Sequence, residues 1–149
     1  MLLKEICTPE VVHCTPETTA LALARLMRER HVGDVVVVED GENDQTPVGV
    51  VTDRDLVVEV LGRERDPAKV CAREIMRKPV VIARTTEDTN HAIERMKAHG
   101  VRRIPVMDEQ RRLAGIVSLD DLLKQLAAEA GALVDIVARE QDREHRNRR

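Results

Sequence analysis

Two short stretches of this sequence place a hydroxyl side chain three residues before a carboxylate, at residues 49–55 and again at residues 115–121. Each stretch begins with Gly and two β-branched apolar residues, which favour a buried strand. The hydroxyl residue then suits the N-cap of a helix, and the carboxylate falls in its first turn. Such a corner offers backbone N–H groups to an anion and a carboxylate to the hydroxyls of a ribose. The two pairs are Thr52 with Asp55 and Ser118 with Asp121.

The same pattern also has a purely structural interpretation. A Ser or Thr N-cap with an acid in the first helical turn is an ordinary capping pair, and the helix dipole favours the acid. One copy alone would favour capping. Because the pattern occurs twice, and the residues around it repeat as well, we favour a binding role.

The composition narrows the possible functions. The chain has 149 residues, enough for one domain or two small ones, and 42% of them are hydrophobic, which favours a folded core. Phe, Tyr and Trp are absent, so bases cannot stack on aromatic rings. The net charge of −3 gives no general attraction to nucleic acid. We therefore expect no nucleic-acid partner, and any planar ligand must lie between aliphatic side chains.

Three cysteines, Cys7, Cys14 and Cys71, lack a C-x-x-C spacing. We expect them to be buried or half-buried free thiols in a reducing compartment. The first residues lack the apolar run of a signal peptide, and no apolar stretch is long enough to span a membrane. These features predict a cytoplasmic protein without a membrane partner.

The chain is an internal duplication. Residues 15–19 correspond to residues 85–89, and Gly49 corresponds to Gly115, in the same order. The acidic loop 39–47 is longer than its counterpart in the second copy and is expected to be a surface turn. The predicted organisation is repeat 1 at residues 1–62, a linker at 63–69, repeat 2 at 70–126, and a C-terminal helix with a charged tail at 127–149.

Each repeat predicts the same elements: a short extended segment, a helix, two strands joined by a turn, and a closing helix. The two strands should pair antiparallel. The run Val35–Val38 does not alternate with polar residues, so both of its faces should be buried, and Gly100 should end the second repeat's first helix. The closing helices are expected from residue 53 to about 61 and from residue 119 to about 130.

The C-terminal region carries one apolar helical face, formed by Leu122, Leu126, Leu133 and Val137. This face either packs on the helix's own domain or forms a dimer contact, and the sequence favours neither. The charged residues 139–149 are expected to form a frayed, solvated tail.

Together, these duplicated segments resemble a pair of cystathionine-β-synthase (CBS) domains, also called a Bateman module. The resemblance covers residues 6–126 and is best in residues 100–118. It implies an α/β (α+β) fold of two pseudo-symmetric repeats, each a small β-sheet with flanking helices, with the sheets packed together. It also implies a regulatory homodimer, not an enzyme, that acts on a partner protein and binds AMP, ADP, ATP, S-adenosylmethionine or NAD(H) in clefts built from both repeats.

The resemblance assigns one cleft to the first corner. Thr52 and Asp55 would hold the ribose of the ligand, and the segment Lys78, Pro79 and Val80 would form the adenine wall. Arg102 and Arg103 would face the phosphates, because guanidinium groups make bidentate, charge-assisted bonds to them. The other residues expected in this cleft are Val101, Ile104 and Pro105.

The second cleft would be built around Ser118 and Asp121. The first repeat would contribute Thr8, Pro9, Glu10, Val11, Val32, Gly33 and Asp34. Asp34 corresponds by position to Arg103, and its carboxylate would repel phosphate. We therefore expect the first cleft to be the main nucleotide site. The second would be empty or would take a neutral or cationic adenosyl ligand.

Two other classes of function have less support in the sequence. The histidines are scattered, and neither a nucleophile–base arrangement nor a phosphate-binding Gly-rich loop occurs. Cys7, His13 and Cys14 are close together but lack standard ligand spacing, so we expect no metal site. The main alternative to nucleotide binding is a ligand-free dimerisation or protein-interaction module.

Overall fold

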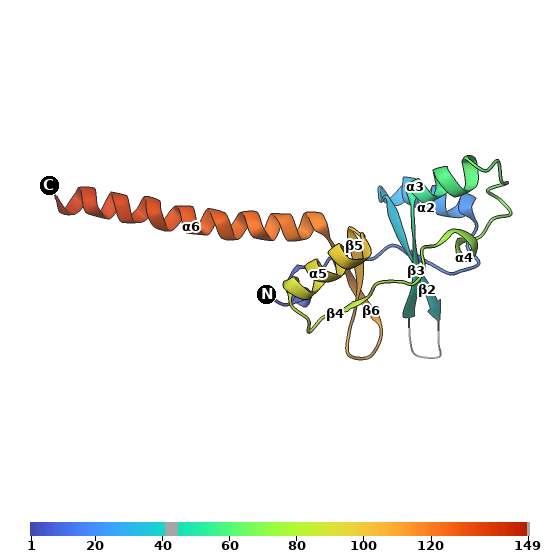
Figure 1. Cartoon of the computed structure of the whole chain (residues 1–149), viewed down its shortest axis with the longest axis horizontal. Helices are drawn as coiled ribbons and strands as arrows, with labels where there is room; N and C mark the ends of the chain where they lie inside the picture. Colours follow the sequence, from blue (N-terminus) through green and yellow to red (C-terminus); the bar gives the residue numbers. More distant parts are fainter. Residues whose placement is uncertain (41–44, 149) are drawn as a thin grey trace.

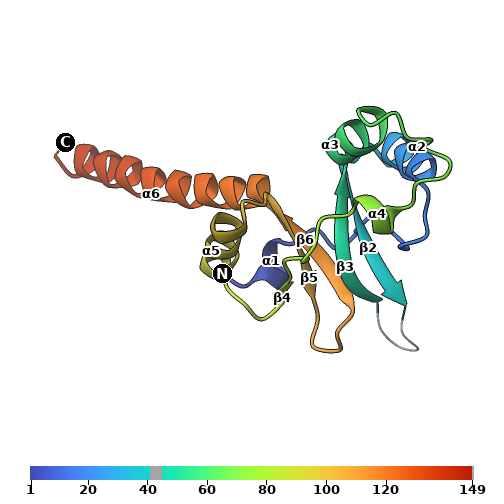
Figure 2. The same ribbon diagram turned by 45° about the vertical axis from the view of Figure 1, so that its right-hand side comes forward.

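The chain folds into two small three-stranded sheets with flanking helices (Figure 1). The computed structural model describes residues 1–40 and 45–148, so residues 41–44 of the expected surface turn lie outside the described residues. The strand orders are β1-β2-β3 and β4-β5-β6, and the two sheets lie side by side in both ribbon views (Figure 2). This arrangement confirms the predicted α+β fold of two repeats.

Repeat 1 confirms the predicted antiparallel strand pair. Its elements are β1 (His13–Cys14), α2 (Ala20–Arg30), β2 (Asp34–Asp40), β3 (Gln45–Thr52), α3 (Asp53–Asp55) and the π-helix η1 (Leu56–Leu61). β2 runs parallel to β1 and antiparallel to β3. All four valines from Val35 to Val38 are at most 1% exposed, as the non-alternating run predicted. Val35 and Val37 pack with Leu23 and Met27 of α2 in one core.

Repeat 2 has the same topology. Its elements are β4 (Ala83–Arg84), α5 (Thr89–His99), β5 (Arg103–Met107), β6 (Leu113–Ser118) and α6 (Leu119–Asn147). Gly100 ends α5 at a φ of 62°, a left-handed conformation that glycine adopts without strain, as predicted. Ala92 and Met96 of α5 pack with Ile104, Val106 and Val117 in a second core.

The short segment that opens each repeat packs on the other repeat. Leu3 of α1 (Leu3–Ile6) is fully buried in the core of repeat 2, and Thr8 forms a β-bridge with Ile116 of β6. Conversely, α4 (Ala72–Ile75) joins the core of repeat 1, and Arg77 bridges Val50 of β3. Each core therefore includes a short segment from the start of the other repeat.

The C-terminal helix differs from the prediction in length and position. α6 is one continuous helix to Asn147, so the expected end near residue 130 and the expected frayed tail are wrong. Beyond its first turns it extends away from both repeats (Figure 1). Leu122 is buried, but Leu126, Leu133 and Val137 are 53–65% exposed, so this face does not pack on its own domain. Among the described residues, no helix combines the length and hydropathy needed to cross a membrane.

Candidate functional site

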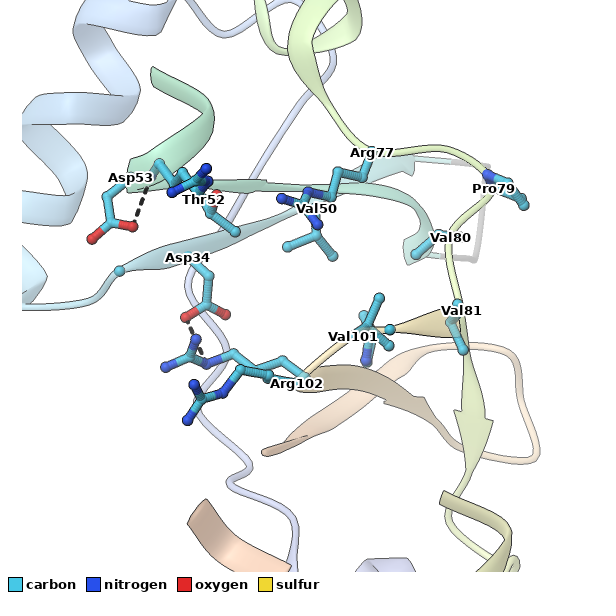
Figure 3. A pocket seen from close by; sticks show the side chains of 15 residues that line it. Asp34, Val50, Thr52, Asp53, Arg77, Pro79, Val80, Val81, Val101 and Arg102 are labelled. Carbon is cyan, nitrogen blue, oxygen red and sulfur yellow. Dashed lines mark hydrogen bonds and ion pairs between the residues drawn. The ribbon is translucent and has the colours of Figure 1, made fainter. Parts of the chain in front are cut away.

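A cavity of about 480 Å³ lies between the two repeats (Figure 3). Repeat 1 contributes the corner where β3 meets α3 and the start of β2, and repeat 2 contributes the loop into β5. The chain between α4 and β4 closes one side. The lining residues are Gly33, Asp34, Val50, Thr52, Asp53, Arg54, Arg77, Pro79, Val80, Val81, Gly100, Val101, Arg102, Arg103 and Pro105. The size is within the range of small-molecule sites, roughly 300–1,000 Å³.

The corner at Thr52 is held by reciprocal capping bonds. The Asp55 N–H donates to Thr52 Oγ1 at 3.1 Å, and the Thr52 N–H donates to Asp55 Oδ2 at 2.9 Å. The Asp53 N–H donates to the Gly33 carbonyl at 2.9 Å, which ties the corner to the start of β2. Thr52 Oγ1 accepts one bond here and keeps its own proton for donation to a ligand.

The second corner has the same geometry. The Asp121 N–H donates to Ser118 Oγ at 3.1 Å, and the Ser118 N–H donates to Asp121 Oδ2 at 2.8 Å. The Ser118 hydroxyl also donates to Asp121 Oδ2, at 2.7 Å. The Leu119 N–H bonds the Arg102 carbonyl at 2.8 Å, just as Asp53 bonds Gly33 in the first corner. Unlike the Thr52 hydroxyl, the Ser118 hydroxyl therefore already donates its proton to a neighbouring carboxylate.

Four arginines and two carboxylates line the cavity. Arg103 Nε lies 3.0 Å from Asp34 Oδ1, and Arg77 Nε lies 3.4 Å from Asp55 Oδ1. Among the described residues, Arg54 and Arg102 have no carboxylate within ion-pair distance. The cavity therefore carries an excess of positive charge and could attract an anion.

Burial raises the pKa of Asp34 above its usual range. The Arg103 guanidinium opposes this rise in pKa, and the nearby Asp53 carboxylate adds to it. Ionisation of Asp34 therefore carries a desolvation cost that the Arg103 guanidinium only partly offsets.

The opposite wall of the cavity is apolar. Val50 and Val80 face it from the repeat 1 side, and Val101 faces it from the loop into β5 (Figure 3). Val81, Pro79 and Pro105 complete this wall. Because the chain has no aromatic residue, these aliphatic side chains form the surface available to a planar ligand.

The structure brings most of the predicted first-cleft residues together. Those that line the cavity are Thr52, Pro79, Val80, Val101, Arg102, Arg103 and Pro105. Asp55, Lys78 and Ile104 are not among the lining residues. Asp55 is buried behind the corner in its capping bonds, Ile104 is fully buried in the core of repeat 2, and Lys78 is exposed outside the cavity.

The residues predicted for the second cleft lie on several cavities. Gly33 and Asp34 line the first cavity, between the two repeats. Ser118 lines a small cavity of about 160 Å³ beside Arg102 and Arg103. Pro9, Glu10, Val11 and Val32 line another of about 650 Å³, and Thr8 and Asp121 line neither of these two.

Six further residues line the cavity that were not among the predicted site residues: Gly100, Val50, Asp53, Arg54, Arg77 and Val81. Asp53 and Arg54 lie inside the 49–55 pattern, so the signal was present but was assigned only to Thr52 and Asp55. Arg77 directly precedes the segment 78–80 that was expected to form a wall.

The model of the family described as CBS domain matches this chain twice, at residues 3–62 and 72–128. The chain belongs to the CBS-domain family. The uncharacterized protein MK0525 of Methanopyrus kandleri is 38% identical over 120 residues, which is 80% of this chain and 60% of MK0525. This chain therefore spans less than two thirds of that relative.

Solved structures of CBS proteins share the fold. The crystal structure of Hypoxic Response Protein I, with two coordinated zinc ions, has a TM-score of 0.73 and 29% identity and covers 84% of this chain and 98% of its own. The CBS pair of MJ0100, in complex with 5-methylthioadenosine and S-adenosyl-L-methionine, has a TM-score of 0.73 at 22% identity. The match covers 87% of this chain and 98% of the MJ0100 chain. Within the described part of this chain, no group of three or more His, Cys, Asp or Glu could hold a metal ion.

Proposed function

We propose that this CBS pair senses an adenosine nucleotide of the AMP, ADP or ATP class in the cavity between its repeats, and transmits occupancy to a partner protein instead of catalysing a reaction. The observation that carries the proposal is a single cavity that combines aliphatic side chains, a hydroxyl corner and four arginines. These groups are chemically complementary to the base, the sugar and the phosphate of a nucleotide.

The adenine would lie against Val50, Val80 and Val101, where dispersion and burial replace aromatic stacking. The phosphate would bind Arg102 and Arg103 through charge-assisted hydrogen bonds.

The ribose would sit between these two groups, at Thr52 and Asp53. The Thr52 hydroxyl can donate to the sugar, and Asp53 Oδ2 is free to accept, because Asp53 Oδ1 accepts from the Arg54 N–H at 2.8 Å. This assigns the ribose to Asp53, which lines the cavity, and makes Asp55 a positioning residue that holds the corner and Arg77.

An adenosyl ligand is also chemically reasonable for this fold, since the CBS pair of MJ0100 was crystallised with two of them. S-adenosylmethionine is therefore a second candidate, and the acids Asp34 and Asp53 could face its cationic end.

We also infer that the chain forms a homodimer through α6. Leu119, Leu123, Leu126, Ala130, Leu133 and Val137 follow the alternating four- and three-residue spacing of a coiled-coil seam. A parallel, in-register pair would place Glu140 against Glu140 in continuation of this seam. An antiparallel pair centred near Ala130 instead covers Leu123 with Val137 and Leu126 with Leu133.

The ligand is tested on purified full-length protein. Without Trp or Tyr the chain absorbs little at 280 nm, so a co-purified nucleotide gives a direct peak at 260 nm. Thermal shifts are then measured with AMP, ADP, ATP, S-adenosylmethionine and NAD, since a ligand at 100 times its Kd adds about 2.7 kcal/mol. No shift with any of them would favour the ligand-free interaction module.

The dimer is tested by light scattering of the wild type and Leu133→Glu, with Leu61→Glu as the matched control. Leu133 and Leu61 are 65% and 66% exposed, but only Leu133 lies on α6. Loss of the dimer in Leu133→Glu alone supports the α6 contact, whereas loss in the control alone places the contact on η1.

A further inference from the structure

One ion pair joins the two repeats across the cavity. Asp34 begins β2 and pairs in register with Thr52, whereas Arg103 begins β5 and pairs in register with Ser118. The two residues therefore occupy the same position in each copy of the duplication. They meet each other, with Arg103 Nε 3.0 Å from Asp34 Oδ1.

This contact is part of the wall of the cavity. The Asp34 side chain is 12% exposed and the Arg103 side chain 43%, and both line the cavity. Figure 3 shows Asp34 extending from the β2 side toward the arginine side chains at Arg102. The closest approach is made by Arg103 Nε, and the terminal nitrogens of the guanidinium carry further N–H donors. Any anion bound by Arg103 must therefore lie close to the Asp34 carboxylate.

The balance of charges defines the anion that fits. Asp34 offsets Arg103, and Asp55 lies beside Arg77 at 3.4 Å. Among the described residues, Arg102 and Arg54 have no carboxylate within ion-pair distance, and Asp53 is the second acid that lines the cavity. Such a cavity can compensate one phosphate group, but each further phosphate adds charge near a fixed carboxylate.

We propose that Asp34 is a specificity-determining residue that limits the ligand to few phosphates and favours a nucleoside monophosphate over a triphosphate. The proposal rests on the proposed nucleotide function. Arg102 would hold the first phosphate, while Asp34 would repel a longer chain and compete with it for Arg103. Replacing Asp34 by Asn keeps the shape of the side chain and removes this repulsion.

The test is isothermal titration of full-length protein in magnesium-free buffer with AMP, ATP and inorganic tripolyphosphate. The variants are Asp34→Asn and, as the control with the same change of charge, Asp108→Asn. Asp108 is also paired with an arginine, Arg112 at 3.0 Å, but it follows the opposite end of β5 from Arg103. Asp34→Asn should lower the Kd of ATP and of tripolyphosphate on the order of tenfold and the Kd of AMP much less. The reason is that the repulsion removed by the substitution grows with the charge of the ligand. Asp108→Asn should leave the ratio of AMP to ATP affinity unchanged.

The outcomes separate this inference from the proposed function. If wild type binds AMP and ATP but Asp34→Asn keeps the wild-type ratio, Asp34 is not a selectivity residue and the nucleotide function stands. If no nucleotide binds but Asp34→Asn still tightens tripolyphosphate, the nucleotide function fails and the role of Asp34 stands. No effect on any of the three ligands overturns the inference. Circular dichroism checks the fold of each variant, and Asp34→Ser replaces Asp34→Asn if the latter is unfolded.

Discussion

Repeat 1 and repeat 2 share their strand order and the capping geometry of their corners, but differ in charge where they meet. The start of β2 carries Asp34, and the start of β5 carries Arg103 at the equivalent position. In a pseudo-symmetric pair, equivalent positions near the axis face each other. If both repeats had the same residue at this position, two like charges would face each other across the cavity. Opposite charges turn that contact into an ion pair and make the cavity between the repeats asymmetric.

The helices that follow the two corners differ as well. After Thr52 the chain forms one turn of α-helix and a π-helix that ends at Leu61, whereas after Ser118 it forms a helix to Asn147. Repeat 1 thus ends within its own fold, and repeat 2 extends an apolar face into solvent. The same corner therefore serves ligand binding in one copy and presents a dimerisation helix in the other, if both proposals hold.

The largest expected effect is the loss of stability when the short helix that opens one repeat no longer packs well on the other repeat. Leu3 is fully buried in the core of repeat 2, so Leu3→Ala should lower the free energy of unfolding by about 2–5 kcal/mol. Ile75→Ala should have a similar effect through the core of repeat 1, where Ile75 is 6% exposed. Urea unfolding of both variants measures this. A cost below 1 kcal/mol for Leu3→Ala would mean that α1 is not part of the second core.

The next comparison is between the two acids of the first corner. Asp53→Asn should weaken nucleotide binding by about 1.5–3 kcal/mol, because it removes a charged acceptor for the ribose. Asp55→Asn should instead reduce stability, because Asp55 is buried and holds the corner. Asp108→Asn, which removes the same charge from a residue that does not line the cavity, is the control. Titration with AMP and urea unfolding separate the two effects, and the reverse result would return the ribose to Asp55.

These acids show how far the sequence alone could lead. The duplication and the strand pattern predicted both sheets, the buried valines and the capped corners, because these features depend on local periodicity. The pattern could not show which acid faces outward, since the backbone of Thr52 engages Asp55 and leaves Asp53 exposed to the cavity. It also placed Asp34 in a second cleft, because alignment identifies equivalent positions without showing that two of them meet.

The length of α6 was missed for a different reason. The predicted end near residue 130 coincides with Gly131, and glycine is a typical helix stop. The surrounding alanines and the later Arg and Glu residues are strong helix formers, and they carry the helix past one glycine that costs only about 1 kcal/mol.

A smaller effect is expected at the two glycines that begin the corner patterns. A Cβ on Gly115 would lie 2.8 Å from the backbone oxygen of Thr8, and a Cβ on Gly49 would lie 2.9 Å from Met76 Cβ, which moves only with its backbone. Gly115→Ala and Gly49→Ala should therefore each cost about 1–3 kcal/mol of unfolding free energy. A cost below about 0.5 kcal/mol for either variant in urea unfolding would show that the backbone at that position shifts easily.

The smallest effect is the pH dependence that comes from Asp34. Burial raises its pKa in the folded protein, against the opposing effect of Arg103 on β5 and with the added effect of Asp53 on α3. An acid with a raised pKa stabilises the fold at pH values below its unfolded pKa, about 3.9 for Asp, and loses this contribution as the pH rises through its folded pKa. Wild type should thus lose stability relative to Asp34→Asn as the pH rises through that folded value.

Urea unfolding of wild type and Asp34→Asn at several pH values between 3.5 and neutral measures the difference, with roughly constant ionic strength. Acids with a lowered pKa, such as Asp88 and Asp108, are present in both proteins and cancel in the difference. If the stability advantage of Asp34→Asn over wild type shrinks as the pH rises, the ion pair with Arg103 outweighs the cost of burial. Asp34 would then stabilise the contact between the two repeats instead of weakening the fold.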